Sequence, residues 1–153
     1  AHHSNDPFEE RVLWAMGRVA EAVQVARRDE SRFAASPMLL AFSRGHRAAI
    51  EGRTDDVLSA LQPFETIGQT DGEASFYVAG SYAKAGLLDR AHALLRRAID
   101  VGFLCLPAFE RDVYLAPLRG TESWRALMEQ LTPKHQWVVN EFARAGGREL
   151  LRL

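Results

Sequence analysis

The sequence predicts an all-α fold made of repeated antiparallel helix pairs. Two observations predict it. Glycines return at intervals of 34 or 35 residues, at Gly17, Gly52, Gly86 and Gly120. The first three stand between two segments whose apolar residues recur at helical spacing. A self-similar period of this length is typical of stacked helical repeats, and no alternating stretch of strand length competes with it.

The pair around Gly52 covers residues 36–68. Ser36-Pro37 places an N-cap residue before a proline at the first helical position, which predicts a helix start. After Gly52, Val57, Ala60, Leu61 and Phe64 fall on one helical face, and Pro63 should kink or shorten that second helix. Three further start signals are Asp6-Pro7, Thr132-Pro133 and the capping-box spacing of Thr70 to Glu73.

The pair around Gly86 covers residues 71–102. Its second helix has an apolar stripe, and Gly102 and Gly146-Gly147 follow apolar runs where a left-handed cap is expected. We interpret the pairs Arg27-Arg28 and Arg96-Arg97 as cations near helix C-terminal ends. The residues of the stripe are Ala91, Leu94, Leu95 and Ala98.

These residues resemble a tetratricopeptide repeat (TPR) array. The copy around Gly86 matches best, and the copy around Gly52 matches through similar small and large residues. The resemblance implies a right-handed superhelical α-solenoid in a single domain, 1–153, with repeats at 6–30, 36–68, 71–102 and 106–132. The matching residues are Tyr82, Gly86, Ala91, Leu95 and Ala98 in one copy, Gly45, Ala48, Gly52, Val57, Leu61 and Phe64 in the other, and Gly17, Ala22 and Ala26 in the first.

The tail departs from the repeat pattern. Pro107 and Pro117 interrupt the first helix of its repeat, which is similar to a degenerate closing repeat in large bacterial multidomain signalling proteins. We expect residues 133–146 to form a separate helix that caps the last apolar face, as stacked repeats require.

Composition narrows the function classes. The chain has 19 Lys and Arg against 20 Asp and Glu, a net charge of −1, so no global field favours nucleic acid. Arginines crowd the first third, but neighbouring acids offset them, which favours a solvated, ion-paired surface. Apolar runs are too short for a membrane span. Cys105 is the single cysteine, which fits a reducing, cytoplasmic setting.

No catalytic or metal-binding motif occurs in the chain. Its histidines form no HExxH, Cys105 lies in the apolar stretch FLCLP and is interpreted as a core residue, and no phosphate-binding glycine loop is found. We therefore expect a protein that is not an enzyme and that uses no cofactor.

The TPR resemblance implies a concave groove, lined by the first helix of each pair, that binds a peptide or partner domain. A protein-interaction module of a larger bacterial regulator is the main hypothesis. The alternative is a structural domain that forms a homodimer through its exposed terminal repeat. Carried over by position, the groove residues are Leu39, Phe42, His46, Ala49, Ile50, Glu73, Phe76, Gly80, Ala83 and Lys84.

Two points about that groove stay open at the level of sequence. Phe42 and Phe76 occupy equivalent steps, so they either line the groove or pack between repeats. The variant of the family that clamps a carboxylate needs paired Lys and Asn on this face, and Lys84 alone does not satisfy it.

Overall fold

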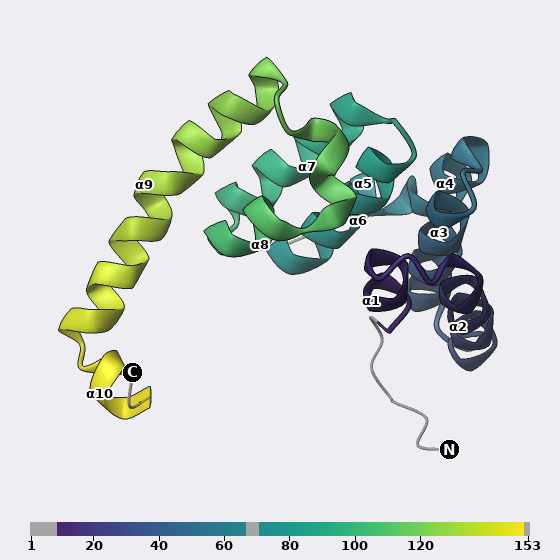
Figure 1. Cartoon of the computed structure of the whole chain (residues 1–153), viewed down its shortest axis with the longest axis horizontal. Coiled ribbons are helices and arrows are strands. Elements are labelled where there is room, and N and C mark those ends of the chain that lie inside the picture. Colours follow the sequence, from purple (N-terminus) through teal and green to yellow (C-terminus); the bar gives the residue numbers. More distant parts are fainter. Residues whose placement is uncertain (1–8, 67–70, 152–153) are drawn as a thin grey trace.

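The computed structural model describes residues 9–66 and 71–151, and within these ranges all regular structure is helical (Figure 1), which confirms the all-α class. The helices are α1 (Glu9–Ala15), α2 (Val19–Arg32), α3 (Pro37–Ile50), α4 (Thr54–Leu61), α5 (Pro63–Thr66), α6 (Gly72–Lys84), α7 (Leu88–Asp100), α8 (Leu106–Arg111), the 3₁₀ helix η1 (Val113–Leu118), α9 (Glu122–Arg144) and α10 (Gly147–Leu151).

The recurring glycines lie where the chain turns between helices. Gly17, Gly52 and Gly86 have φ of 76°, 74° and 80°, and they join α1 to α2, α3 to α4 and α6 to α7. Gly120, with φ of 88°, lies just before α9. These are left-handed backbone conformations that residues with a Cβ rarely adopt. The interpretation of the glycines as turn residues is confirmed.

Helix starts and breaks follow the predicted signals in two places. α3 begins at Pro37, and Pro63 separates α4 from α5, so the shortened second helix is confirmed. α6 is capped by Asp71, whose carboxylate accepts from the N–H groups of Glu73 and Ala74 at 2.9 and 3.1 Å. The predicted signals at Asp6-Pro7 and Thr70 lie outside the described residues.

The separate capping helix predicted for residues 133–146 is wrong. α9 runs without interruption from Glu122 to Arg144 and includes Pro133. Thr132 does not act as an N-cap, because its hydroxyl donates to the Met128 carbonyl at 2.8 Å, one turn back in the same helix. His135 Nδ1–H donates to the Leu104 carbonyl at 2.8 Å, which holds the helix to the body just beyond the proline.

The paired arginines also differ from the prediction in the first copy. α2 continues to Arg32, so Arg27 and Arg28 lie inside the helix and not at its end. The Arg28 guanidinium pairs with Glu9 of α1 at 3.0 Å, which ties the two helices together. Arg97 does lie in the last turn of α7, where its guanidinium donates to the Glu65 carbonyl at 3.4 Å.

The hydrophobic core is centred on α6, which packs against α7, α3 and η1. Close approach depends on small residues: a Cβ at Gly45 of α3 would overlap the side chain of Leu61 in α4. The largest fully buried apolar side chains come from six elements, and they include Leu61, Tyr82, Leu95, Ile99, Phe109, Leu115 and Leu131.

Candidate functional site

The predicted groove is largely filled by the chain itself. Six of its ten residues are buried, so the prediction that they line an open groove is wrong for these six: His46, Ala49, Ile50, Phe76, Gly80 and Ala83. α1 and η1 cover His46, Ile50 and Gly80 near the C-terminal ends of α3 and α6. Phe76 packs against Phe103 and Phe109, with ring centroids 5.0 and 5.1 Å away, so it belongs to the core.

The buried half of this face contains a polar cluster, which we call the inner cluster: Glu10, Arg11, His46, Ser81, Asp112 and Tyr114. Arg11 of α1 is its centre. Its guanidinium pairs with the Asp112 carboxylate at 2.5 Å and lies over the Tyr114 ring, 4.0 Å from the centroid. Only 8% of the Arg11 side chain and 14% of the Asp112 side chain are exposed. The ion pair therefore joins α1 to the N-cap residue of η1, with little of either side chain exposed to solvent.

Hydrogen bonds in the inner cluster fix the protonation state of His46. Arg11 donates to Nε2 at 3.0 Å, and because a guanidinium has no acceptor, the ring proton must be on Nδ1. That proton is donated to Ser81 Oγ at 2.7 Å. Complete burial, followed by the positive charge of Arg11, holds the pKa of His46 well below its ordinary value. His46 is therefore neutral, and it links α1, α3 and α6.

Equivalent positions of the repeats meet in this cluster. Arg11, His46, Gly80 and Tyr114 each stand six residues before a turn glycine. His46 and Tyr114 stack with centroids 4.9 Å apart. A Cβ at Gly80 would lie 3.2 Å from Cβ of Tyr114 and 3.3 Å from an Arg11 guanidinium nitrogen. Gly80 therefore leaves the space that the two larger side chains occupy.

The other half of the same face is open. Three predicted groove residues, Leu39, Phe42 and Glu73, line a hollow of about 250 Å³ between the N-terminal halves of α3 and α6. We call it the α3/α6 groove. Leu39 is 48% exposed, and the Phe42 ring packs against His46 and Phe64, at centroid distances of 5.3 and 6.3 Å. The full lining is Met38, Leu39, Phe42, Phe64, Asp71, Glu73, Ala74 and Tyr77.

Charge in the α3/α6 groove is acidic and lies at the first turn of α6. Asp71 and Glu73 are both exposed, and the charged residues among its lining are these two carboxylates. Asp71 caps α6, and Glu73 accepts from the Tyr77 hydroxyl at 3.2 Å. The surface is thus an apolar, aromatic depression with an acidic rim. Lys84, the tenth predicted residue, lies apart from it, with its ammonium over Trp14 of α1 at 5.2 Å.

Sequence reasoning missed Phe64 and Tyr77 as groove residues. The apolar spacing places Phe64 in the core stripe of the second helix, and it is buried, but one side of it also lines the groove. The 34-residue shift pairs Phe42 with Phe76, whereas a shift of 35 residues, the interval from Gly17 to Gly52, pairs it with Tyr77. The 35-residue interval therefore indicates Tyr77 as the counterpart of Phe42 in the groove.

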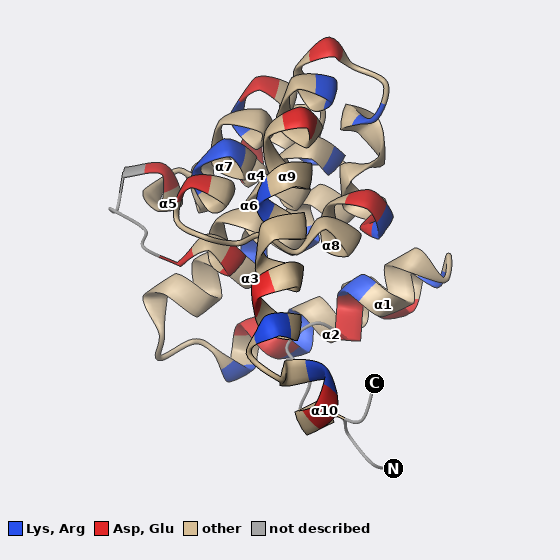
Figure 2. Cartoon of the chain, turned by 90° about the vertical axis from the view of Figure 1, so that its left-hand side faces the viewer, with Lys and Arg blue, Asp and Glu red and all other residues tan. Residues whose placement is uncertain are grey.

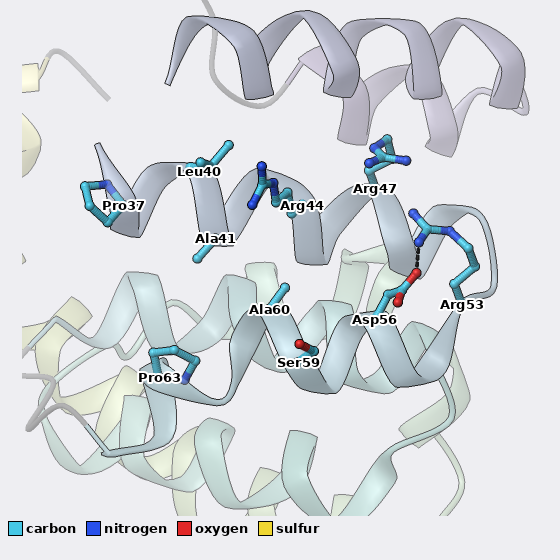
Figure 3. Close-up of a pocket in the computed structure, with 10 residues that line it drawn as sticks. All are labelled: Pro37, Leu40, Ala41, Arg44, Arg47, Arg53, Asp56, Ser59, Ala60 and Pro63. Carbon is cyan, nitrogen blue, oxygen red and sulfur yellow. Dashed lines mark ion pairs between the residues drawn. The ribbon is translucent and has the colours of Figure 1, made fainter. Parts of the chain in front are cut away.

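A larger hollow of about 570 Å³ lies between α3 and α4 (Figure 3). Its arginines already have carboxylate partners: Arg47 pairs with Glu30 at 2.5 Å, and Arg53 pairs with Asp56. Arg44 lies 3.9 Å from Glu30. Because these charges are compensated within the chain, the hollow has no strong requirement for an anionic ligand. Figure 2 shows the same mixing, with basic and acidic residues interspersed along the helices.

Catalytic and metal-binding groups are not brought together in the part of the chain that the structure describes. No three His, Cys, Asp or Glu residues there are placed to hold a metal ion. Cys105 is exposed at the start of α8, so its interpretation as a core residue is wrong. Its neighbours Leu104 and Leu106 are the residues that pack against the core. Among residues 9–66 and 71–151, no helix is long and apolar enough to cross a bilayer.

Comparison of the chain with protein-family models, with curated proteins and with solved structures gives no match.

Proposed function

We propose that the chain is a non-catalytic protein-interaction module of the TPR type, and that it binds a partner peptide in the α3/α6 groove. The observation that carries this proposal is an apolar depression that the described residues, 9–66 and 71–151, leave uncovered on a face that they otherwise seal. Exposed apolar hollows with a few polar groups at their edge are typical binding surfaces. The TPR assignment is supported by the glycine period and by the three helix pairs that the glycines join.

The lining defines the chemistry of the partner. Leu39, Phe42 and Tyr77 offer apolar and aromatic contact, which suits a large aliphatic or aromatic anchor. Asp71 and Glu73 favour lysine or arginine beside that anchor, because opposite charges at a rim improve association rate and specificity. The expected partner is therefore a short segment with an apolar anchor and basic flanks, within the regulatory context that the sequence resemblance implies.

A phage-displayed library of random 12-residue peptides, selected on the full chain, tests this proposal. We expect enrichment of peptides that have one or two large apolar residues next to Lys or Arg. Leu39→Asp should weaken the binding of a selected peptide at least about tenfold, because it places a charge in the apolar floor. Glu73→Lys should select against basic flanks.

Matched controls separate groove binding from general surface effects. Val19→Asp changes a side chain of similar exposure, 44%, at the first residue of α2, and Glu122→Lys reverses an equivalent first-turn acid in α9. Both should bind the selected peptide as the parent does. Selection of no peptide, or equal loss in the controls, would refute the proposed groove.

A second function has its own observation. Val12, Met16 and Val19 are 55%, 64% and 44% exposed and form an apolar edge around the turn between α1 and α2. This edge supports the alternative of a structural domain that self-associates through its first repeat. Sedimentation of Met16→Asp beside the parent chain tests it, because loss of a dimer in this variant is expected only if the edge is the interface.

A further inference from the structure

The C-terminal half of α9 and α10 form an arm that leaves the body of the molecule. The last contact that ties α9 to the body through a hydrogen bond is His135 to Leu104. Beyond it, the hydrogen bonds and ion pairs that residues 136–151 make in the described structure join them to each other. Figure 1 shows α9 extending away from the other helices, with α10 at its end. We call residues 136–151 the arm.

The arm exposes large apolar side chains. Trp137 is 63% exposed and Phe142 42% exposed, and they lie on the free part of α9. In α10 the exposed fractions of Leu150 and Leu151 are 82% and 57%. Scattered single apolar residues are normal on a protein surface, but a run of this kind along one projecting segment marks an interaction site.

We propose that the arm of one copy docks in the α3/α6 groove of a second copy of this chain, an inference that rests on the proposed binding role of that groove. The complementarity has two parts. Leu150 and Leu151 supply the apolar anchor that the groove lining suits. Arg148, exposed beside them, supplies the cation that would face Asp71 and Glu73, whereas Arg144 already pairs with Glu141 of the arm at 2.5 Å.

A second copy is required because the arm cannot reach its own groove while α9 stays helical. Leu127 and Leu131 are buried and fix the first half of α9 to the body. The free half, residues 136–144, adds about 13 Å of straight helix in a direction set by that anchorage. In Figure 1, α10 and α3 lie toward opposite ends of the long axis of the molecule.

Two copies that exchange their arms would form a closed dimer and not an open chain of molecules. If each copy inserts its arm into the groove of the other, the two identical contacts are related by a twofold axis and the result is a closed dimer. Partner peptides would then compete with the arm for the groove, so the dimer would be the form of the protein that awaits its partner.

Disulfide trapping between single-cysteine variants tests the contact directly. Cys105→Ser removes the native thiol, and Leu39→Cys and Leu150→Cys are each introduced into that background in separate full-length chains. Mild oxidation of the mixed chains should give a heterodimer far above either homodimer, because the proposed contact joins position 39 of one copy to position 150 of the other. A Leu150→Cys homodimer as the main product would show arm-to-arm pairing and overturn the proposal.

Sedimentation velocity of the chains with native Cys105 provides the second measurement. The parent should be a dimer, and Leu39→Asp and the double variant Leu150→Asp/Leu151→Asp should each raise the dimer dissociation constant at least about tenfold. Met16→Asp should leave it unchanged. A dimer that is lost only in Met16→Asp, or a monomeric parent, would also overturn the proposal.

The peptide selection distinguishes failure of the arm-docking proposal from failure of the proposed peptide-binding function. A monomeric parent that still binds selected peptides, with loss in Leu39→Asp, would remove the arm as occupant and retain the groove. Since the substituted leucines of the arm are exposed, thermal melts of the double variant should match the parent and exclude unfolding as the cause.

Discussion

The two ends of the α3–α6 face differ in what covers them. At the C-terminal end, Arg11 and Tyr114 from α1 and η1 close over His46 and Gly80, and polar groups are buried in a hydrogen-bonded cluster. At the N-terminal end, Leu39 is 48% exposed beside an acidic rim. One continuous helical stripe is therefore core at one end and surface at the other. What decides the role of a residue is the neighbouring element that reaches it.

The largest effect should come from breaking the ion pair that closes the inner face. In Asp112→Ala, Arg11 would keep its buried charge without the carboxylate 2.5 Å away, and η1 would lose the cap at the Tyr114 N–H. Removing one partner of a buried pair costs about 3–5 kcal/mol. Urea unfolding followed by circular dichroism measures this loss.

The matched control is an exposed pair of the same length. Arg18 and Glu21 also lie 2.5 Å apart, but about half of each side chain is exposed, so Glu21→Ala should leave the midpoint nearly unchanged. Equal losses in the two variants would mean that the inner cluster is as solvated as the surface. Asp112→Asn, which keeps a capping oxygen, separates the charge from the cap.

A second prediction concerns space in place of charge. Gly80→Val introduces a branched side chain where even a Cβ would be 3.2 Å from Tyr114 and 3.3 Å from Arg11. Overpacking of this kind costs about 1–3 kcal/mol. Ala93→Val places the same side chain on the exposed side of α7 without the collision. Valine is a better helix former than glycine but a poorer one than alanine, so helix propensity alone would favour Gly80→Val, and a larger loss in that variant would come from the collision. If thermal melts show the same shift for both variants, the inner face is looser than the described contacts indicate.

Much of the closed end could have been predicted from the sequence, although its closure could not. The period placed Gly17, Gly52 and Gly86 at turns, and Pro63 correctly marked a helix break. The same period places Arg11, His46 and Tyr114 at one equivalent step. Whether such positions converge or line an open groove depends on the rotation between successive helix pairs, which follows from side-chain packing and not from spacing.

The open end was harder to predict because the exposure of a residue depends on whether another helix packs over it, and the residue's own sequence neighbourhood does not show this. Leu39 and Ile50 have the same apolar character and lie on the same helix, yet their exposed fractions are 48% and 7%. The continuation of α9 through Pro133 was also missed because tertiary contacts decide it. Pro133 locally favours a helix break, but the buried Leu131 before it and the hydrogen bond of His135 after it hold both sides of the proline in one helix.

The pH dependence of stability provides a third, smaller effect at the closed end. In the unfolded chain His46 titrates near pH 6.5, whereas in the folded chain burial and Arg11 hold its pKa well below that value. Below pH 6.5 the unfolded state therefore binds a proton that the folded state does not. The stabilising contribution is present above pH 6.5 and is lost as the pH falls.

The predicted change in the free energy of unfolding with pH corresponds to the uptake of one proton by His46. The free energy of unfolding should fall by up to about 1.4 kcal/mol per pH unit below pH 6 from this residue. The charged groups that face the ring are Arg11, Glu10 (its carboxylate 3.9 Å from Nε2) and, through Arg11, Asp112. Urea titrations of the parent and of His46→Gln from pH 5 to 7.5 isolate the contribution. Identical slopes would show that His46 takes up its proton at the same pH in the folded and the unfolded state, and so that its pKa is not lowered by folding.

The smallest effect on stability is expected at the open end, from Leu39→Ala. Because nearly half of Leu39 is already exposed, truncation removes little buried area and alanine is the better helix former, so stability should change by no more than about 0.5 kcal/mol. Ile50→Ala, about three turns further along the same helix and 7% exposed, should cost about 2–4 kcal/mol because it leaves a cavity. Binding should show the reverse order, since Leu39→Ala removes contact area in the groove and Ile50→Ala does not touch it. Thermal melts should therefore rank Ile50→Ala as the more damaging variant, and peptide titrations should rank Leu39→Ala as the more damaging one. The same ranking in both assays would show that the face is not divided into a sealed end and an open end.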